Sequence, residues 1–96
     1  MGYIETLQDA VRQAHGSDPN HIRSVPVKEV FRGQTIWEGT VEVFELTGHP
    51  RAKLCYAWGF YPDDKTKEMR IITALGVPPV DSPLAAVRAS ITGGCV

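Results

Sequence analysis

The stretch from residue 35 to residue 61 constrains the fold more than any other part of this chain. Two runs rich in β-branched and aromatic residues, Thr35–Leu46 and Arg51–Tyr61, flank the segment Thr47-Gly48-His49-Pro50. Glycine and proline favour turns, and strand-forming runs on both sides of a turn are typical of a β-hairpin. We therefore predict a hairpin at the centre of the fold.

A four-residue loop predicts a register in which Leu46 lies opposite Arg51. Because side chains alternate between the two faces of a strand, this register sorts the hairpin into two faces. One face, the core face, holds the pairs Val43 with Leu54, Val41 with Tyr56, Gly39 with Trp58 and Trp37 with Phe60. Gly39 leaves room there for the ring of Trp58. The other face, the outer face, mixes apolar and polar residues: Ile36, Glu38, Thr40, Glu42, Phe44, Lys53, Cys55, Ala57, Gly59 and Tyr61.

Two further strands are predicted on either side of this hairpin. Residues 21–31 alternate as a strand, and Pro26 within them predicts an edge strand or a bulge, because proline donates no ladder hydrogen bond. Residues 68–75 form the last strand, with apolar side chains in both phases. We expect both sides of that strand to be covered.

Helices are predicted at both ends of the chain. Residues 3–15 carry apolar side chains at helical spacing, followed by Gly16 as a C-terminal stop. Ser82 is a good N-cap before Pro83, and the apolar stripe that follows ends at residues 93–94, both glycine.

The predicted fold is an α+β domain covering residues 1–96, with the order α-β-β-β-β-α. The four strands form an antiparallel meander, and both helices are expected to pack on its core face. A chain of 96 residues is short for more than one domain.

Composition excludes several classes of protein. Ten basic and eleven acidic residues give a net charge of -1, which argues against nucleic acid and anionic membranes as partners. No apolar run approaches the roughly 20 residues that a membrane-spanning helix needs. Cys55 and Cys95 lie far apart in sequence, so we expect free thiols in a reducing cytoplasm and no disulfide. We predict no cofactor and no metal site, since the histidines and cysteines show no ligand spacing.

The outer face is the candidate ligand site. Four residues are predicted to bind ligand there, namely Glu38, Glu42, Phe44 and Tyr61. Two carboxylates beside aromatic rings favour a cationic ligand. The carboxylates of Glu38 and Glu42 should lie about 13 Å apart along the strand. An acid/base pair needs about 5 to 9.5 Å, so catalysis by this pair is not expected.

Three stretches of the chain carry a resemblance to a known family. They are residues 24–33 with 35–39, residues 48–52 with 55–58, and residues 78–88. The chain resembles a family of small bacterial proteins and is similar to products of mobile integron gene cassettes, over about residues 7 to 91. The resemblance implies a small α+β homo-oligomer and assigns no catalytic or binding residue.

The sequence leaves three functions open. The first is a non-enzymatic homo-oligomeric module, a dimer or a dimer of dimers, that binds a small molecule or a partner protein on its outer sheet face. The second is a small enzyme whose site forms between subunits. The third is a nucleic-acid-binding module, which the charge balance disfavours.

Overall fold

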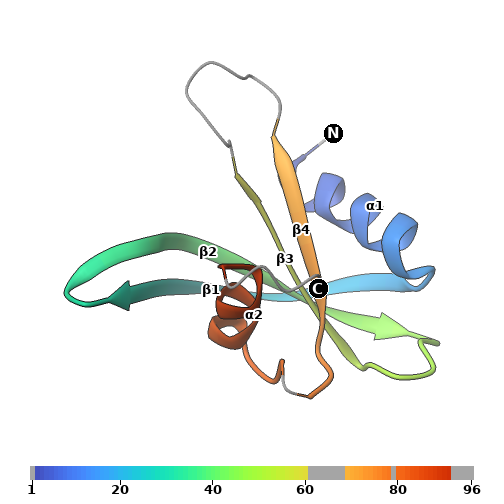
Figure 1. The fold of residues 1–96 in the computed structure, drawn as a ribbon. Helices are drawn as coiled ribbons and strands as arrows, with labels where there is room; N and C mark the ends of the chain where they lie inside the picture. The colour runs from blue at the N-terminus through green and yellow to red at the C-terminus, as the bar shows by residue number, and fades with distance from the viewer. Residues whose placement is uncertain (1, 61–68, 79, 92–96) are drawn as a thin grey trace.

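The computed structural model describes residues 2–60, 69–78 and 80–91. The elements follow in the order α1 (Tyr3–His15), β1 (Asp18–Phe31), β2 (Gln34–Thr47), β3 (Leu54–Phe60), β4 (Arg70–Leu75) and α2 (Pro83–Ile91). The strands form one antiparallel sheet in the order β1-β2-β3-β4 (Figure 1). This confirms the predicted α+β class, the meander and the order of the elements.

The two longest strands, β1 and β2, form a hairpin that projects from the rest of the molecule (Figure 1). We call its projecting part, residues 24–41, the arm. The arm ends in a tight turn at Arg32 and Gly33, both at positive φ (52° and 77°), as the two-residue turns that suit twisted hairpins require. Ile22 in β1 and Ile36 in β2 have no partner in the register and form β-bulges. β1 is an edge strand, as Pro26 predicted.

The register between β2 and β3 differs from the predicted one by two residues. Val43 lies opposite Tyr56 instead of Leu54, and only Glu42–Glu45 pair with Leu54–Ala57. Because the shift is even, the paired residues Glu42–Glu45 and Leu54–Ala57 stay on their predicted faces. The two hairpins diverge beyond Glu42, so the expected pairing of Gly39 with Trp58 does not occur.

A different tryptophan uses the space above Gly39. A Cβ atom on Gly39 would lie 2.9 Å from the Trp37 ring, which therefore folds over this residue of its own strand. Trp37 meets Trp58 edge-on, with ring centroids 5.8 Å apart. The predicted role of Gly39 was right, but the ring that needs it belongs to Trp37.

The two helices cover opposite faces of the sheet, so the expectation that both pack on the core face was wrong. Ala86 and Val87 of α2 pack with the core-face residues Val41, Val43 and Trp58. On the outer face, α1 covers a second cluster consisting of Leu7, Val11, Phe44, Leu46, Ala52, Cys55 and Ala57. Phe44, Cys55 and Ala57 of the outer face are thus covered by a helix of the same chain. The fold has three layers instead of two.

β4 is covered on both sides, as its two-phase apolar pattern predicted. Ile72 and Ala74 belong to the cluster under α2, whereas Ile71 and Leu75 belong to the cluster under α1.

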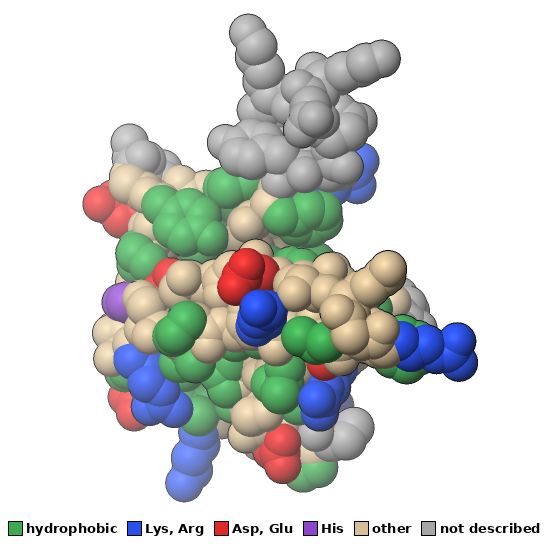
Figure 2. Space-filling view, turned by 90° about the vertical axis from the view of Figure 1, so that its left-hand side faces the viewer, with side chains coloured by type: hydrophobic (Ala, Val, Ile, Leu, Met, Phe, Trp, Pro, Cys, Tyr) green, Lys and Arg blue, Asp and Glu red, His purple; other side chains and the backbone are tan. Residues whose placement is uncertain are grey.

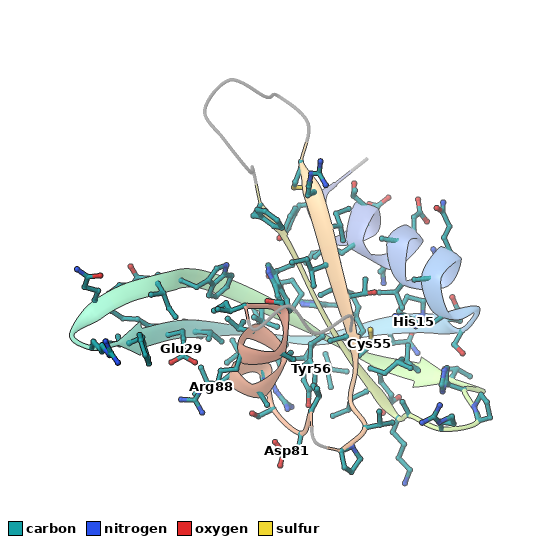
Figure 3. The ribbon with its side chains drawn as sticks, in the orientation of Figure 1. His15, Glu29, Cys55, Tyr56, Asp81 and Arg88 are labelled. Atoms are coloured by element: carbon teal, nitrogen blue, oxygen red, sulfur yellow. The ribbon has the colours of Figure 1, made fainter. Side chains whose placement is uncertain are left out.

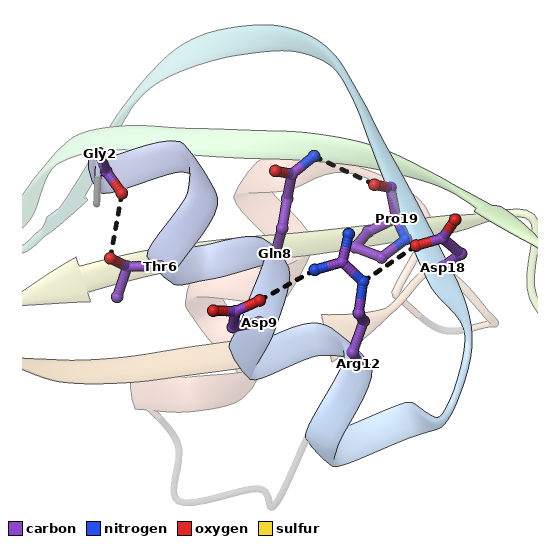
Figure 4. Close-up of polar contacts among 7 residues, drawn as sticks. All are labelled: Gly2, Thr6, Gln8, Asp9, Arg12, Asp18 and Pro19. Atoms are coloured by element: carbon purple, nitrogen blue, oxygen red, sulfur yellow. Dashed lines mark hydrogen bonds and ion pairs between the residues drawn. The ribbon is translucent and has the colours of Figure 1, made fainter.

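Polar contacts fix α1 against the start of β1 (Figure 4). The side chain of Gln8 donates to the carbonyl oxygen of Pro19 at 3.1 Å. Arg12 pairs with both Asp9 and Asp18 at 2.9 Å. The short link at Gly16, where φ is 71°, turns the chain directly from α1 into β1.

Candidate functional site

The structure does not assemble the predicted ligand site as an open face. Phe44 is fully buried under α1, and Glu42 is only 5% exposed. Glu38 is exposed on the arm, opposite Lys28 in the register. Tyr61 lies outside the described residues. The predicted exposure of this face was therefore wrong for Phe44 and Glu42 and correct for Glu38.

Glu42 is held by a polar cluster at the edge of the sheet. His21 Nε2 lies 2.8 Å from Glu42 Oε1, and the hydroxyl of Ser24 donates to the same oxygen. The His21 ring also packs on Phe44 at 5.4 Å between centroids. These contacts satisfy a buried carboxylate, which would otherwise be costly to remove from water.

Sequence reasoning missed this cluster because of the bulge at Ile22. In a regular strand, His21 and Ser24 would point to opposite faces. The extra residue changes the phase of β1, so that both side chains reach Glu42 on the same face.

A groove lies between the end of the arm and α2, and its residues were not predicted. Its volume is about 500 Å³, and its lining residues are Glu29, Val30, Phe31, Ile36, Arg88 and Ile91. The space-filling view from the side of the arm shows hydrophobic side chains reaching the surface in areas separated by charged groups (Figure 2). The available signal in the sequence was the apolar pair Val30-Phe31 next to a tight turn, where solvated residues are usual.

An ion pair forms the polar part of the groove. Arg88 Nε of α2 contacts Glu29 Oε2 of β1, and the two labelled side chains point toward one another (Figure 3). The other oxygen, Glu29 Oε1, accepts a hydrogen bond from the backbone N–H of Val30 at 3.1 Å. Glu29 is buried, so this pair links the arm to α2 and presents a neutralised polar surface beside apolar side chains.

The titratable groups elsewhere do not form an activated nucleophile among the described residues. Burial raises the pKa of the Cys55 thiol to about 12, so the thiol is protonated at neutral pH. Burial, with a smaller contribution from nearby His49, lowers the pKa of His15. Within residues 2–60, 69–78 and 80–91 there is no group of three or more His, Cys, Asp or Glu side chains that could hold a metal ion.

Comparison of the chain with protein-family models, with curated proteins and with solved structures found no match. None of the helices in the described ranges combines the length and hydropathy needed to cross a bilayer.

Proposed function

We propose that this protein is a non-enzymatic binding module that holds a small, mainly apolar molecule in the groove between the arm and α2. One observation supports this proposal above the others. Six large hydrophobic side chains are exposed in the described part of the chain, and four of them line this groove: Val30, Phe31, Ile36 and Ile91. Convergent exposed apolar side chains mark binding surfaces in small proteins.

The chemistry of the groove favours an uncharged or weakly polar ligand. Its volume, about 500 Å³, falls in the range of roughly 300 to 1,000 Å³ typical of small-molecule sites. Glu29 and Arg88 neutralise each other, so neither offers an unpaired charge to an ionic ligand. A polar group on the ligand can instead hydrogen-bond to the ion pair while its apolar body packs on Phe31 and Ile36.

A cationic ligand is the second candidate, because Glu38 remains exposed on the arm.

We also propose that the protein is a cytoplasmic homo-oligomer of the integron-cassette type. The buried free thiol of Cys55 supports a reducing compartment. The resemblance described above motivates the family and oligomer parts, which stay predictions.

The chain offers a closely matched pair of variants for testing the groove. Ile36 and Ile22 are both 45% exposed, and both sit at β-bulges, but only Ile36 lines the groove. We expect the uncharged dye N-phenyl-1-naphthylamine to bind the wild-type protein saturably in a fluorescence titration. Ile36→Ser should weaken binding about tenfold. A bound ligand covers this isoleucine, and the covered side chain contributes more than about 1.4 kcal/mol to the binding free energy. Ile22→Ser should leave the affinity unchanged.

Equal affinities in the two variants, or no saturable binding to the wild type, would contradict the groove proposal. Cationic and anionic naphthyl dyes of the same size test the charge preference. Tighter binding of the cationic dye, reduced by Glu38→Gln, would favour the second candidate over an uncharged ligand.

A further inference from the structure

The divergence of the two hairpins leaves one edge of β2 without a partner strand among the described residues. β2 begins at Gln34, but its first partner in β3 is Ala57, opposite Glu42. Among the described residues, none pairs with β2 on this side between Gln34 and Val41. We call this segment the free edge.

The direction of the backbone N–H and C=O groups along the free edge follows from the hydrogen bonds that β2 makes on the side of β3. Leu46 N–H donates to Lys53 O at 2.8 Å, on the side of β3. Backbone groups alternate sides along an antiparallel strand, so Glu42, Thr40 and Glu38 direct theirs to that side as well. The N–H and C=O groups of Glu38 and Thr40 therefore face outward at the free edge.

The facing edge of β3 differs, because it is satisfied from within the chain. The odd-numbered residues of β3 direct their backbone groups toward β2, as Cys55 and Ala57 do in the register. The next one, Gly59, donates its N–H to the hydroxyl of Tyr3 in α1 at 2.8 Å. Divergence has thus exposed two edges, and α1 covers a donor on only one of them.

The outer edge of β1 is protected in ways that the free edge is not. β1 contains the prolines Pro19 and Pro26, the basic residues Arg23 and Lys28, and the bulge at Ile22. Prolines, basic side chains and bulges are the features that keep exposed strands from pairing with other chains. The free edge shares only one of these features, the bulge at Ile36 near its start. It has no proline and no basic residue, and its only charge is Glu38.

We propose that a second copy of this chain pairs with the free edge, antiparallel, through its own free edge. Any strand that pairs with the free edge must end before Glu42, because β2 pairs with β3 from Glu42 onward. When the second copy lies antiparallel, the Gln34 end of its β2 lies nearest to β3 of the first copy. Its β2 starts there, directly after the two-residue turn, so it does not run on into β3. Each copy therefore uses the same segment, residues 34–41, against the same segment of the other copy. Such a contact is two-fold symmetric.

The two arms then form one sheet in the order β1-β2-β2-β1, in which each partner's edge is covered. Thr35, Thr40 and the half-buried Trp37 suit such pairing, since β-branched and aromatic residues stabilise cross-strand pairs. This inference rests on the proposed homo-oligomer and names its interface. It does not depend on ligand binding in the groove.

A proline substitution at Thr40 tests the interface directly. Proline has no backbone N–H, so it removes the outward donor of residue 40 and should leave the hydrogen bonds between β1 and β2 intact. Pro26, which lies opposite Thr40, already occupies such a position on the outer edge of β1. Thr40→Val is the matched control, because it keeps the N–H and the β-branched shape. Light scattering should give twice the chain mass of 10.6 kDa for the wild type and Thr40→Val, and a single chain for Thr40→Pro.

Folding of the proline variant is checked by the near-ultraviolet circular dichroism of the Trp37–Trp58 pair. If Thr40→Pro does not fold, amide hydrogen exchange on the wild type decides. The amides of Glu38 and Thr40 should become protected as protein concentration rises, whereas that of Val41, which faces β1, should be protected throughout. A monomeric wild type at tens of micromolar, a folded Thr40→Pro dimer, or exchange at Glu38 and Thr40 that ignores concentration would each overturn the proposed pairing.

These outcomes separate the interface from the ligand site. A protein that binds the dye but stays monomeric retains the groove and loses the pairing. A dimer that binds no dye retains the pairing and loses the groove.

Discussion

Trp58 is the largest fully buried side chain in the cluster under α2. Its ring packs edge-on against Trp37, which in turn lies over Gly39. Removing the ring leaves a cavity that the rigid sheet cannot close. We expect Trp58→Ala to reduce the free energy of unfolding by about 3 to 5 kcal/mol in chemical denaturation. Trp58→Phe, which keeps most of the volume, should lose clearly less. A loss below about 1 kcal/mol for the alanine variant would show that Trp58 does not support the core.

His15 makes the stability depend on pH. Its Nε2 lies 2.9 Å from Thr73 Oγ1, and burial together with His49 holds its pKa below the ordinary 6.5. As pH falls through 6.5, the unfolded chain takes up the proton first, so acidification lowers the free energy of unfolding. The loss ends once folded His15 is protonated too. In urea denaturation from pH 7 downward, His15→Gln should show a smaller fall than the wild type, and identical slopes would contradict this assignment.

At the scale of elements, α2 begins where its sequence predicts. The hydroxyl of Ser82 accepts the backbone N–H of Ala85 at 3.1 Å, and Pro83 occupies the first helical position. We expect Ser82→Ala to lower the free energy of unfolding by about 1 kcal/mol, since the cap is lost and an N–H is left unpaired. Ser82→Asp restores an acceptor at the helix N-terminus and should remain near wild type. An alanine variant as stable as the wild type would mean that this cap contributes nothing.

Bulges decide which side chains of the arm act together. Ile22 brings His21 and Ser24 to one face, where they hold Glu42. Ile36 changes the phase of β2 at the end of the arm, next to the groove. Neither bulge was predicted from the sequence, because the alternation of side chains was followed as in an uninterrupted strand.

At the scale of the molecule, one sheet separates two apolar clusters, each closed by one helix. The principal extents are 40 × 31 × 22 Å, and the arm lies beside α2 (Figure 1). This arrangement leaves the arm with a groove on one side and the free edge of β2 on another. The free edge follows from the divergence of the hairpins, whereas the groove follows from the position of α2 beside the end of the arm.

Local patterns in the sequence are enough to predict the fold class, the order of the elements and the face of nearly every strand residue. Turn residues, the Ser82-Pro83 start and period-two alternation act locally, and an even error in register preserves the faces. Trp58 was predicted in the core for this reason, and so were Val41 and Val43.

The layer that each apolar face joins depends on contacts between segments far apart in the chain, and local patterns did not predict it. The pattern of apolar residues along a strand is the same whether a helix of the same chain or another molecule covers that face. Phe44 was therefore assigned to a ligand site, although α1 buries it. The divergence of the hairpins was not predicted either. Two contacts accompany it, the Trp37 ring over Gly39 and the hydrogen bond from the Gly59 N–H to the Tyr3 hydroxyl. Tyr3 and Gly59 lie far apart in the chain, so a local pattern does not predict their contact.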